Sequence, residues 1–399
     1  MKLIEPIVKW QTELSTLRRD FHAHPELAYE EHRTADVVAS TLESWSIPVH
    51  RGLGGTGVVG TIAGRNHSGP CIGLRADMDA LPMQEHNTFA HASTQTGKMH
   101  ACGHDGHMTM LLGAARYLAE NRDFDGTVHV IFQPAEEGMA GARAMINDGL
   151  FKKFPMDAVF GMHNWPGLET GKFAVMPGPM MASSNTFSIQ IEGKGAHGAM
   201  PHLGVDPVMV AVQLAQALQT IVARECDPLE PVVLSITQIH SGSADNVIPN
   251  SAELRGTVRT FSDTALDLVE TRMADITRHT VQAHNAVASF SFDRVYPPTL
   301  NDPTQAAFCA EVIEQLAGPE NLVHDARPSM GAEDFSFMLR EVPGCYIWIG
   351  NGDGGHRDEG HGGGPCMLHN GSYDFNDDII PLGATYWVEL ARAWLAHPR

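Results

Sequence analysis

Hydrophobic and polar positions follow two different periods in the first half of the chain. Apolar residues at helical spacing predict helices over residues 6–22 and 30–45. Short β-rich runs then alternate with helical ones, giving strands at 57–64, 71–77, 127–133 and 157–163 and helices near 106–120 and 139–148. This alternation predicts an α/β fold with a largely parallel central sheet and helices on both faces.

The pattern changes after the small-residue stretch GPMMASS (178–184). The elements that follow are a strand (185–193), a helix (205–224), two strands (232–240 and 252–261), a helix (263–283) and a strand (286–294). This order is the split β-α-β arrangement of ferredoxin-like α+β modules. We therefore expect residues 184–296 to form a domain inserted into a main domain made of 1–183 and 297–399. The α/β pattern resumes there with helices near 303–316 and 332–340, a strand at 345–350 and a closing helix at 378–396.

Composition narrows the class of protein. The 399 residues are 43% hydrophobic, which is enough to bury substantial cores. The net charge is −20 and no basic tract interrupts it, so nucleic acid and anionic membranes are disfavoured as partners. Charged residues divide the apolar stretches of the amino terminus, and no run reaches the length of a transmembrane helix. The six cysteines are scattered, without a disulfide framework. We expect a cytoplasmic, soluble protein that acts on a small molecule.

Side chains of metal-ligand type follow successive predicted elements. Cys102 and His104 stand two apart in MHACGHDGH, a spacing that lets a thiolate and an imidazole converge on one cation. An isolated pair of this kind more often belongs to a polar surface loop in which the thiol is a small buried apolar group. Glu136 and Glu137 follow the strand at 127–133, and His163 ends the next strand, where open α/β sheets form their ligand crevices. Two surface glutamates that begin a helix are the competing interpretation of the pair. A metal would supply the positive charge that adjacent carboxylates need.

A further ligand is expected near the carboxyl terminus. His369 lies in the loop LHNGSYDFND before the closing helix. Its competitors are His356, His361 and Cys366, in or beside the Gly-rich segment 351–364. Spacing alone does not choose among these residues.

Taken together, the motifs resemble a known family, the co-catalytic metallopeptidases that include aminoacylases and the carboxypeptidase that cleaves folate. Within it, the chain resembles the branch of hippurate hydrolases and plant auxin-conjugate hydrolases. The resemblance covers nearly the whole chain in nine ordered segments: 21–31, 74–85, 99–108, 132–138, 161–166, 193–207, 245–250, 331–338 and 368–377. It implies the metallopeptidase type of catalytic domain, with the inserted domain acting as a dimerisation and lid domain.

Carried over by position, the resemblance implies two divalent metal ions per subunit (Mn, Zn, Co or Ni) and the following ligands: Cys102, His104, Glu137, His163 and His369. It also implies that Glu136 is the general base. Most other branches have a metal-binding His where this chain has Asp77. We therefore leave Asp77 and Asp79 outside the ligand set, as residues that orient the ligands.

In the inserted domain, the resemblance implies three more site residues. His197 would reach the active site of a partner chain and stabilise the developing oxyanion, while Asn246 and Arg259 would hold the substrate's carboxylate. The expected assembly is a homodimer, or a tetramer built from dimers. The expected reaction is metal-dependent hydrolysis of an N-acyl amino acid, hippurate-like or N-acetylated. A dipeptidase or carboxypeptidase of the same family, or a non-catalytic metal-binding relative, are the alternatives.

Overall fold

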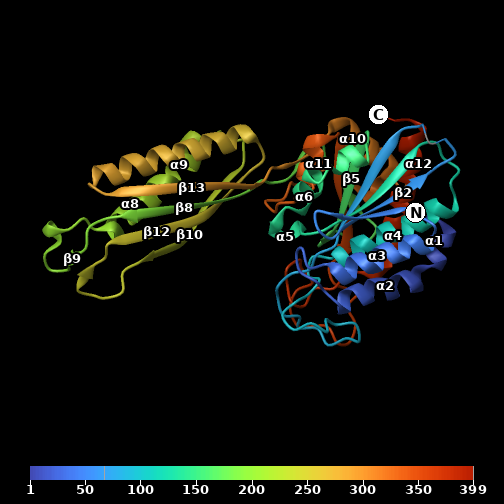
Figure 1. Ribbon diagram of the computed structural model, residues 1–399, viewed down its shortest axis with the longest axis horizontal. Helices are drawn as coiled ribbons and strands as arrows, with labels where there is room; N and C mark the ends of the chain where they lie inside the picture. The colour runs from blue at the N-terminus through green and yellow to red at the C-terminus, as the bar shows by residue number, and fades with distance from the viewer. Residues whose placement is uncertain (67, 399) are drawn as a thin grey trace. The chain divides into compact units, whose positions relative to one another are not determined.

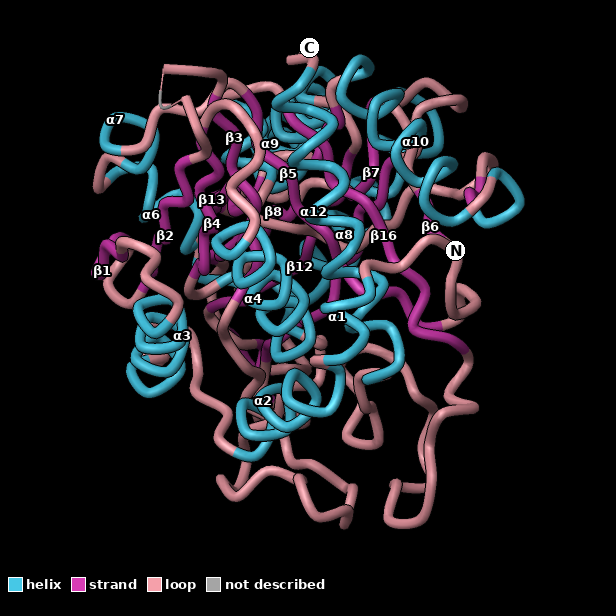
Figure 2. Tube along the Cα trace, turned by 90° about the vertical axis from the view of Figure 1, so that its right-hand side faces the viewer, coloured by secondary structure: helices cyan, strands magenta, loops and turns pink. Residues whose placement is uncertain are grey.

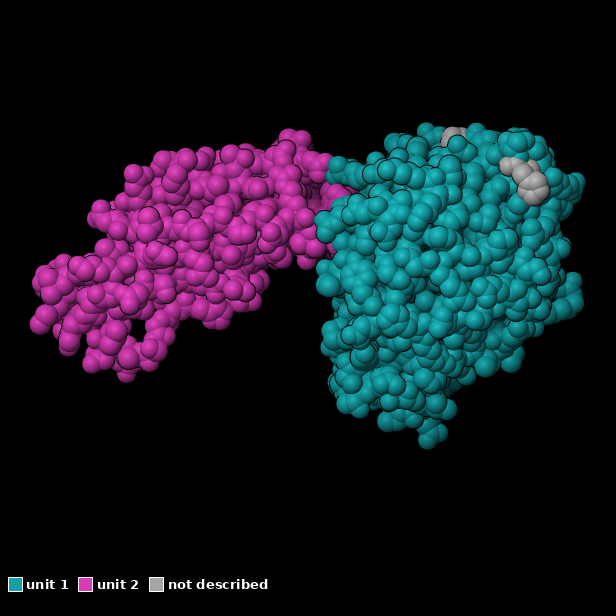
Figure 3. Space-filling model, in the orientation of Figure 1, with its two compact units in different colours: residues 1–180, 300–327, 334–399 teal, residues 181–299, 328–333 magenta. Residues whose placement is uncertain are grey.

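The computed structural model describes residues 1–66 and 68–398, in two compact units (Figure 3). Unit 1 comprises 1–180, 300–327 and 334–399, and unit 2 comprises 181–299 and 328–333. Unit 2 is thus three residues longer at each end than the inserted domain expected from the sequence. It also includes 328–333, which the sequence analysis assigned to the main domain. The reason is a backbone contact, since the amide of Ala182 donates to the carbonyl oxygens of Ser329 and Gly331.

Unit 1 contains an eight-stranded sheet in the order β1-β2-β4-β3-β5-β16-β6-β15. Its central strands β4, β3, β5 and β16 are parallel to one another, whereas β1, β2 and β6 run antiparallel to neighbours. The predicted α/β fold class is confirmed. The strand bounds are β1 Val49–Leu53, β2 Gly57–Ala63, β3 Cys71–Asp77, β4 Thr127–Gln133, β5 Ala158–Pro166, β6 Phe173–Ala174, β15 Leu322–Val323 and β16 Gly344–Gly352. Two further short strands, β7 (Gly178–Met181) and β14 (Thr299–Asn301), pair with each other.

Helices cover both faces of this sheet (Figure 1). Their bounds in unit 1 are α1 Glu5–Lys9, α2 Gln11–Ala23, α3 His32–Ser44, α4 His104–Glu120, α5 Glu136–Met139, α6 Gly141–Asn147, α7 Leu150–Lys153, α10 Pro303–Ala317, α11 Ser336–Glu341 and α12 Ile380–Ala396. The helix expected over 6–22 is divided at Trp10. There the amide is shared between the carbonyls of Pro6 and Ile7, a three-centre bond typical of a helix end.

The core of unit 1 lies around α4, α12 and β3, and Figure 2 shows α4 and α12 among the helices that flank the strands. Every residue of β16 is buried, and α12 buries Trp387 and Trp394. Such continuous burial explains why these elements carry almost unbroken apolar sequence. In the described part of the chain, no helix is both long and apolar enough to span a membrane.

Unit 2 has a four-stranded antiparallel sheet in the order β10-β12-β8-β13. Together with α8 and α9, this is the ferredoxin-like arrangement predicted from the sequence. The bounds are β8 Ser184–Glu192, α8 Pro207–Thr220, β10 Val232–Ser241, β12 Ser251–Thr260, α9 Asp263–Ala283 and β13 Val287–Tyr296. A short ribbon of β9 (Ala196–His197) and β11 (Val247–Ile248) adjoins the end of the sheet where Glu192 pairs with Ser251. Figure 1 shows β9 at that end of the unit.

Candidate metal centre

The carboxyl ends of three parallel strands place the candidate site. β3 lies between β4 and β5, so the residues that end or follow these strands meet at one edge of the sheet. β4 is followed by Glu136 and Glu137, and β5 carries His163. Helix α4 begins at His104, directly after Cys102 and Gly103.

The structure brings together all five residues expected to bind metal. The ligand atoms of Cys102, His104 and His163 lie within 4.8 Å of one another, and so do those of Cys102, Glu137 and His369. The Sγ of Cys102 is 3.3 Å from Nε2 of His163, and Nε2 of His369 is 3.1 Å from Oε1 of Glu137. Because Cys102 belongs to both groups, the two sets form one continuous cluster. Glu136, the expected base, lies within the same distance of His104 and Glu137.

Hydrogen bonds orient two of the imidazoles toward this cluster. Nδ1 of His104 donates to the carbonyl oxygen of Asp79 at 2.8 Å, and Nδ1 of His163 donates to that of Asn164 at 2.6 Å. In the neutral ring each Nε2 then carries a lone pair. Within the described residues, the buried Nε2 of His104 has no hydrogen-bond partner. An unsatisfied nitrogen beside a thiol and carboxylates fits a metal ligand.

Electrostatics also favour a cation at this position. Burial, together with Glu137, Glu136 and Asp77, raises the pKa of the Cys102 thiol well above its ordinary value. Burial disfavours a charged His104, but Asp77 and Asp79 outweigh it and raise its pKa to about 10. Carboxylates therefore surround the site, and the thiol of Cys102 and the ring of His104 hold protons beside them. A divalent cation would replace those protons and leave a thiolate and a neutral imidazole as ligands.

Asp77 and Asp79 lie beside the ligands and make several hydrogen bonds there. Oδ1 of Asp77 accepts a hydrogen bond from Nδ1 of His107, and its Oδ2 accepts one from Arg75, both at 2.6 Å. Although Asp77 lies within 4.8 Å of His104 and His107, both of its oxygens are thus already engaged. Asp79 binds the amide of Glu137 through Oδ2 at 2.9 Å, besides accepting from His104. The engagement of both carboxylate oxygens supports leaving Asp77 outside the ligand set.

Sequence reasoning missed several buried polar residues behind the ligands. Arg75 is fully buried and donates to Asp77, to Gln133 at 2.8 Å and to Asp334 at 3.1 Å. Behind His163, the Nδ2 of Asn164 donates to the hydroxyl of Tyr373 at 2.6 Å. A charged residue inside an otherwise apolar strand was the signal available for Arg75.

Unusual backbone conformations are concentrated here. His369 has φ 59°, Ala135 has φ 54° and Ala140 has φ 57°, a left-handed region that residues with a Cβ rarely adopt. The latter two flank the glutamate pair, and the amide of His369 donates to the carbonyl of Ala101 at 2.8 Å. Gly103 has φ 93°, and a Cβ there would collide with Asn164 and Tyr373. Strain of this kind persists only where surrounding contacts enforce it, and it is common at functional sites.

The structure also separates His369 from its three competitors, which gather around Asp374 instead. His361 bonds to its Oδ2 at 3.0 Å, and the ring of His356 and the thiol of Cys366 bond to its carbonyl oxygen. Asp374 in turn binds the buried Arg18. This second cluster is therefore a hydrogen-bonded network beneath the loops.

In unit 2, His197 and Asn246 lie close together, but Arg259 does not. His197 is exposed on β9, and its Nδ1 accepts from the amide of Ala199 at 3.0 Å, so the neutral ring presents Nε2–H as a donor. The carbonyl of Asn246 accepts from Gly198 beside it. Arg259 lies eight residues beyond Ser251 on β12, which at about 3.3 Å per residue places it about 26 Å from the ribbon end of the sheet. Arg259 is half-buried, and this burial lowers the pKa of its guanidinium.

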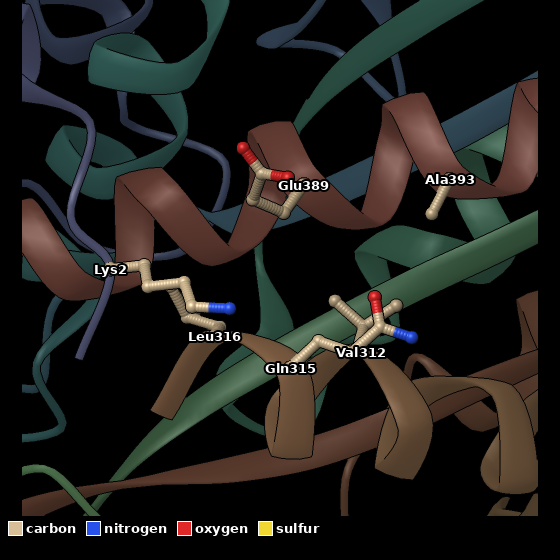
Figure 4. Close-up of a pocket in the computed structure, with 6 residues that line it drawn as sticks. All are labelled: Lys2, Val312, Gln315, Leu316, Glu389 and Ala393. Carbon is tan, nitrogen blue, oxygen red and sulfur yellow. The ribbon is translucent and has the colours of Figure 1, made fainter. Parts of the chain in front are cut away.

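A separate cavity of about 230 Å³ in unit 1 is not part of this cluster. Figure 4 shows its lining by residues of α10, α12 and the amino terminus: Lys2, Val312, Gln315, Leu316, Glu389 and Ala393. Among the described residues that line it there is no histidine or cysteine, so the lining lacks the ligand types of the strand-end site.

Comparison with known proteins identifies the class. The model of peptidase family M20/M25/M40 matches residues 73–393, and the chain belongs to this family of hydrolases. It is 40% identical to a hippurate hydrolase of Campylobacter jejuni, over 99% of this chain and 100% of that one. It is 41% identical to thermostable carboxypeptidase 2 of Saccharolobus solfataricus, over 95% and 93%. A solved Bacillus subtilis structure, described as a dinuclear metal-binding peptidase from the M20 family, has 35% identity and a TM-score of 0.83, covering 98% and 99%.

These findings confirm the family and the enzyme class expected from the motifs. The chain is a metal-dependent hydrolase of amide bonds, of the aminoacylase and hippurate hydrolase type. A non-catalytic relative is disfavoured, because the matched relatives are named as enzymes and the expected base stands beside the expected ligands.

Proposed function

We propose that the protein hydrolyses N-acyl amino acids to a carboxylic acid and a free amino acid, using two divalent ions and Glu136 as general base. The observation that carries the proposal is the convergence of five ligand-type side chains around this glutamate: Cys102, His104, Glu137, His163 and His369. The relative described as dinuclear supports the number of ions. When bound, such ions activate water and polarise the amide carbonyl.

The two adjacent glutamates are held differently, which suits different roles. Asp79 fixes the backbone of Glu137, whose carboxylate faces His369. Glu136 is only 6% exposed, and its Oε1 accepts a hydrogen bond from the amide of Asp334 at 3.3 Å. A backbone donor favours the ionised carboxylate and limits its rotation. Glu136 can therefore take a proton from water and deliver it to the departing amine.

The substrate's carboxylate and its carbonyl oxygen need partners that unit 2 can supply. Arg259 offers a planar, half-buried guanidinium, and His197 offers an outward N–H. Since Arg259 lies about 26 Å along β12 from the end of the sheet that adjoins β9 and His197, one copy of unit 2 cannot bring both to one small substrate. Joint action would require unit 2 of two chains, so we propose a homodimer with shared active sites.

The surface of unit 2 is consistent with such an assembly. β10 is an edge strand of its sheet, with unpaired backbone groups along one side. Next to it, α8 exposes Val208, Met209 and Val212. Edge strands beside apolar helices are surfaces through which two sheets can join.

The nature of the acyl group separates the two candidate functions. The hippurate hydrolase relative favours a simple acyl group, whereas the carboxypeptidase relative keeps a peptide substrate as the second candidate. Assays of N-acetyl amino acids, N-benzoyl amino acids and dipeptides, with Mn, Zn, Co and Ni added singly, test the proposal. We expect kcat/KM to be highest for an N-acyl amino acid. Higher values for every dipeptide would transfer the proposal to a peptidase.

The base is tested by Glu136→Gln, which keeps the size of the side chain. We expect kcat to fall by about a hundredfold or more while the metal content stays unchanged. Glu120→Gln, at the carboxyl end of α4, is the matched control and should behave as wild type. Near-normal turnover of the Glu136 variant would exclude this residue as the base.

A further inference from the structure

The peptide group that joins Glu333 to Asp334 lies where the chain leaves unit 2 and re-enters unit 1. Its carbonyl belongs to the last residue of 328–333, and its N–H belongs to the first residue of 334–399. In a trans peptide these two groups point in opposite directions and lie in one rigid plane. Each of them makes a hydrogen bond within its own unit.

On the unit 2 side, the segment 328–333 is hydrogen-bonded to the residues that precede β8. Ala182 donates to two of its carbonyls, at 3.0 and 2.9 Å, and Met181 forms a bridge with Ser329. The hydroxyl of Thr299 donates to the carbonyl of Glu333 at 3.4 Å. Thr299 is fully buried and is the last residue of unit 2 before the chain enters 300–327.

On the unit 1 side, the carboxylate of Asp334 accepts several hydrogen bonds, and its backbone amide contacts Glu136, the proposed general base. Its oxygens accept from Arg75 at 3.1 Å, from Gln133 at 2.8 Å and from the amide of Ala142 at 2.8 Å. Its own amide donates to Oε1 of Glu136 at 3.3 Å. Any rotation of the Glu333–Asp334 peptide plane therefore changes the donor that the carboxylate of Glu136 receives.

We propose that Thr299 is a positioning residue for Glu136, acting through this single peptide group. The hydroxyl of Thr299 sets the plane of the peptide from unit 2, and the N–H of the same peptide orients the base in unit 1. Carbonyl and amide of one peptide polarise each other, so a bond at one end strengthens the bond at the other. The inference rests on the proposed role of Glu136 and extends it, because it makes the orientation of the base sensitive to the hydrogen bond that Thr299 donates to Glu333.

The lengths of the Thr299–Glu333 and Asp334–Glu136 hydrogen bonds indicate how strongly loss of the Thr299 hydroxyl should affect catalysis. Both exceed the usual range for their type, so each contributes less than an ideal bond. Catalytic hydrogen bonds often tighten only when substrate is bound, and the effect then belongs to turnover rather than to binding. Loss of one neutral hydrogen bond of this kind corresponds to a change of about threefold to tenfold.

The test is Thr299→Val, which replaces the hydroxyl by a methyl group of similar size. With the best substrate of the panel above, we expect kcat to fall about threefold to tenfold, KM to stay within about twofold, and the metal content to remain unchanged. Thr299→Ser retains the donor and should restore most of kcat. This rescue distinguishes positioning through the hydroxyl from a general loss of packing.

The matched control is Thr385→Val in α12, because Thr385 is also fully buried and accepts a hydrogen bond from Ile4. It should lower the thermal midpoint by a similar amount without changing kcat. The inference is wrong if Thr299→Val turns over as fast as wild type, if Thr299→Ser is as slow as Thr299→Val, or if the loss is in KM. The test of Thr299 is distinct from the test of the proposed function. It is interpreted only when the wild-type protein is active and its Glu136→Gln variant is inactive.

Discussion

Metal binding should release protons, because two of the expected ligands hold a proton when no metal is bound. Without metal, the pKa of the Cys102 thiol is raised well above its ordinary value, by burial first and then by the neighbouring carboxylates. The pKa of His104 is raised to about 10, because Asp77 and Asp79 outweigh the effect of burial. Both groups therefore carry a proton at pH 7.5, and both must lose it to become ligands. The pKa of His163 is lowered by burial, so that ring is already neutral and releases none.

We therefore expect about two protons to be released per chain when the site fills at pH 7.5. Calorimetric titration of the metal-free protein with Zn or Mn, in buffers of different ionisation enthalpy, gives this number from the slope of the observed enthalpy. The same protonation states fix how the metal affinity depends on pH. Since both folded-state pKa values lie above neutrality, the logarithm of the apparent binding constant should rise with pH by about two per unit near pH 7.

Cys102→Ser is the decisive variant. A serine hydroxyl stays protonated at this pH, so the count should fall to about one, with weaker binding. Cys226→Ser, in unit 2, removes a thiol outside the metal cluster and should leave the count at about two. If Cys102→Ser releases as many protons as wild type while binding the same number of ions, the thiolate is not a ligand.

Three further predictions follow from individual contacts. Gly103→Ala, which places a Cβ against neighbouring side chains at φ 93°, should lower metal occupancy and activity, as measured by metal analysis and kinetics. A mixture of His197→Ala and Glu136→Gln chains should recover roughly a quarter of wild-type activity after subunit exchange, because about half the dimers then contain one complete site; only the sum of parental activities would contradict shared sites. Arg18→Met leaves three aspartates without their buried partner and should reduce the free energy of unfolding in urea by about 3–5 kcal/mol. Although burial opposes ionisation of Asp374, Arg18 holds its pKa well below the ordinary value, so this contribution is present above about pH 4 and lost as the pH falls further.

The sequence predicted the long elements of the fold well, because each carries many turns or pleats of one period. The helix expected at 263–283 is α9 with the same bounds, and the strand expected at 71–77 is β3. Elements of two to five residues, such as β6, β15 and β1, are too short for any period to show, and their pairing is decided by neighbouring strands. The docking of 328–333 on unit 2 rests on backbone bonds, which side-chain patterns do not encode.

Some residues of the candidate site could likewise be predicted from the sequence, whereas others needed the structure. Residues at strand ends could be named from the sequence, because parallel strands bring their carboxyl ends together whatever the loops do. The choice of His369 over His361 needed the structure, since His369 faces Glu137 and His361 faces Asp374, although both lie near glycines. The separation of Asn246 from Arg259 was also hidden, because it depends on the register of β12 in its sheet rather than on distance along the chain.

If the proposed roles of His197 and Arg259 hold, that separation would require two copies of the chain at each active site. The strand-end cluster of unit 1 holds the expected ligands and base, but these side chains are mostly acceptors and offer few donors to a substrate carboxylate. Unit 2 supplies donors at both ends of one rigid strand, with His197 near one end and Arg259 near the other. Along β12, Arg259 lies about 26 Å from the end of the sheet that adjoins the ribbon of His197, a span far longer than an N-acyl amino acid. Under the proposed function, each end would serve a different site, and a site would receive both donors only when two copies of the chain assemble.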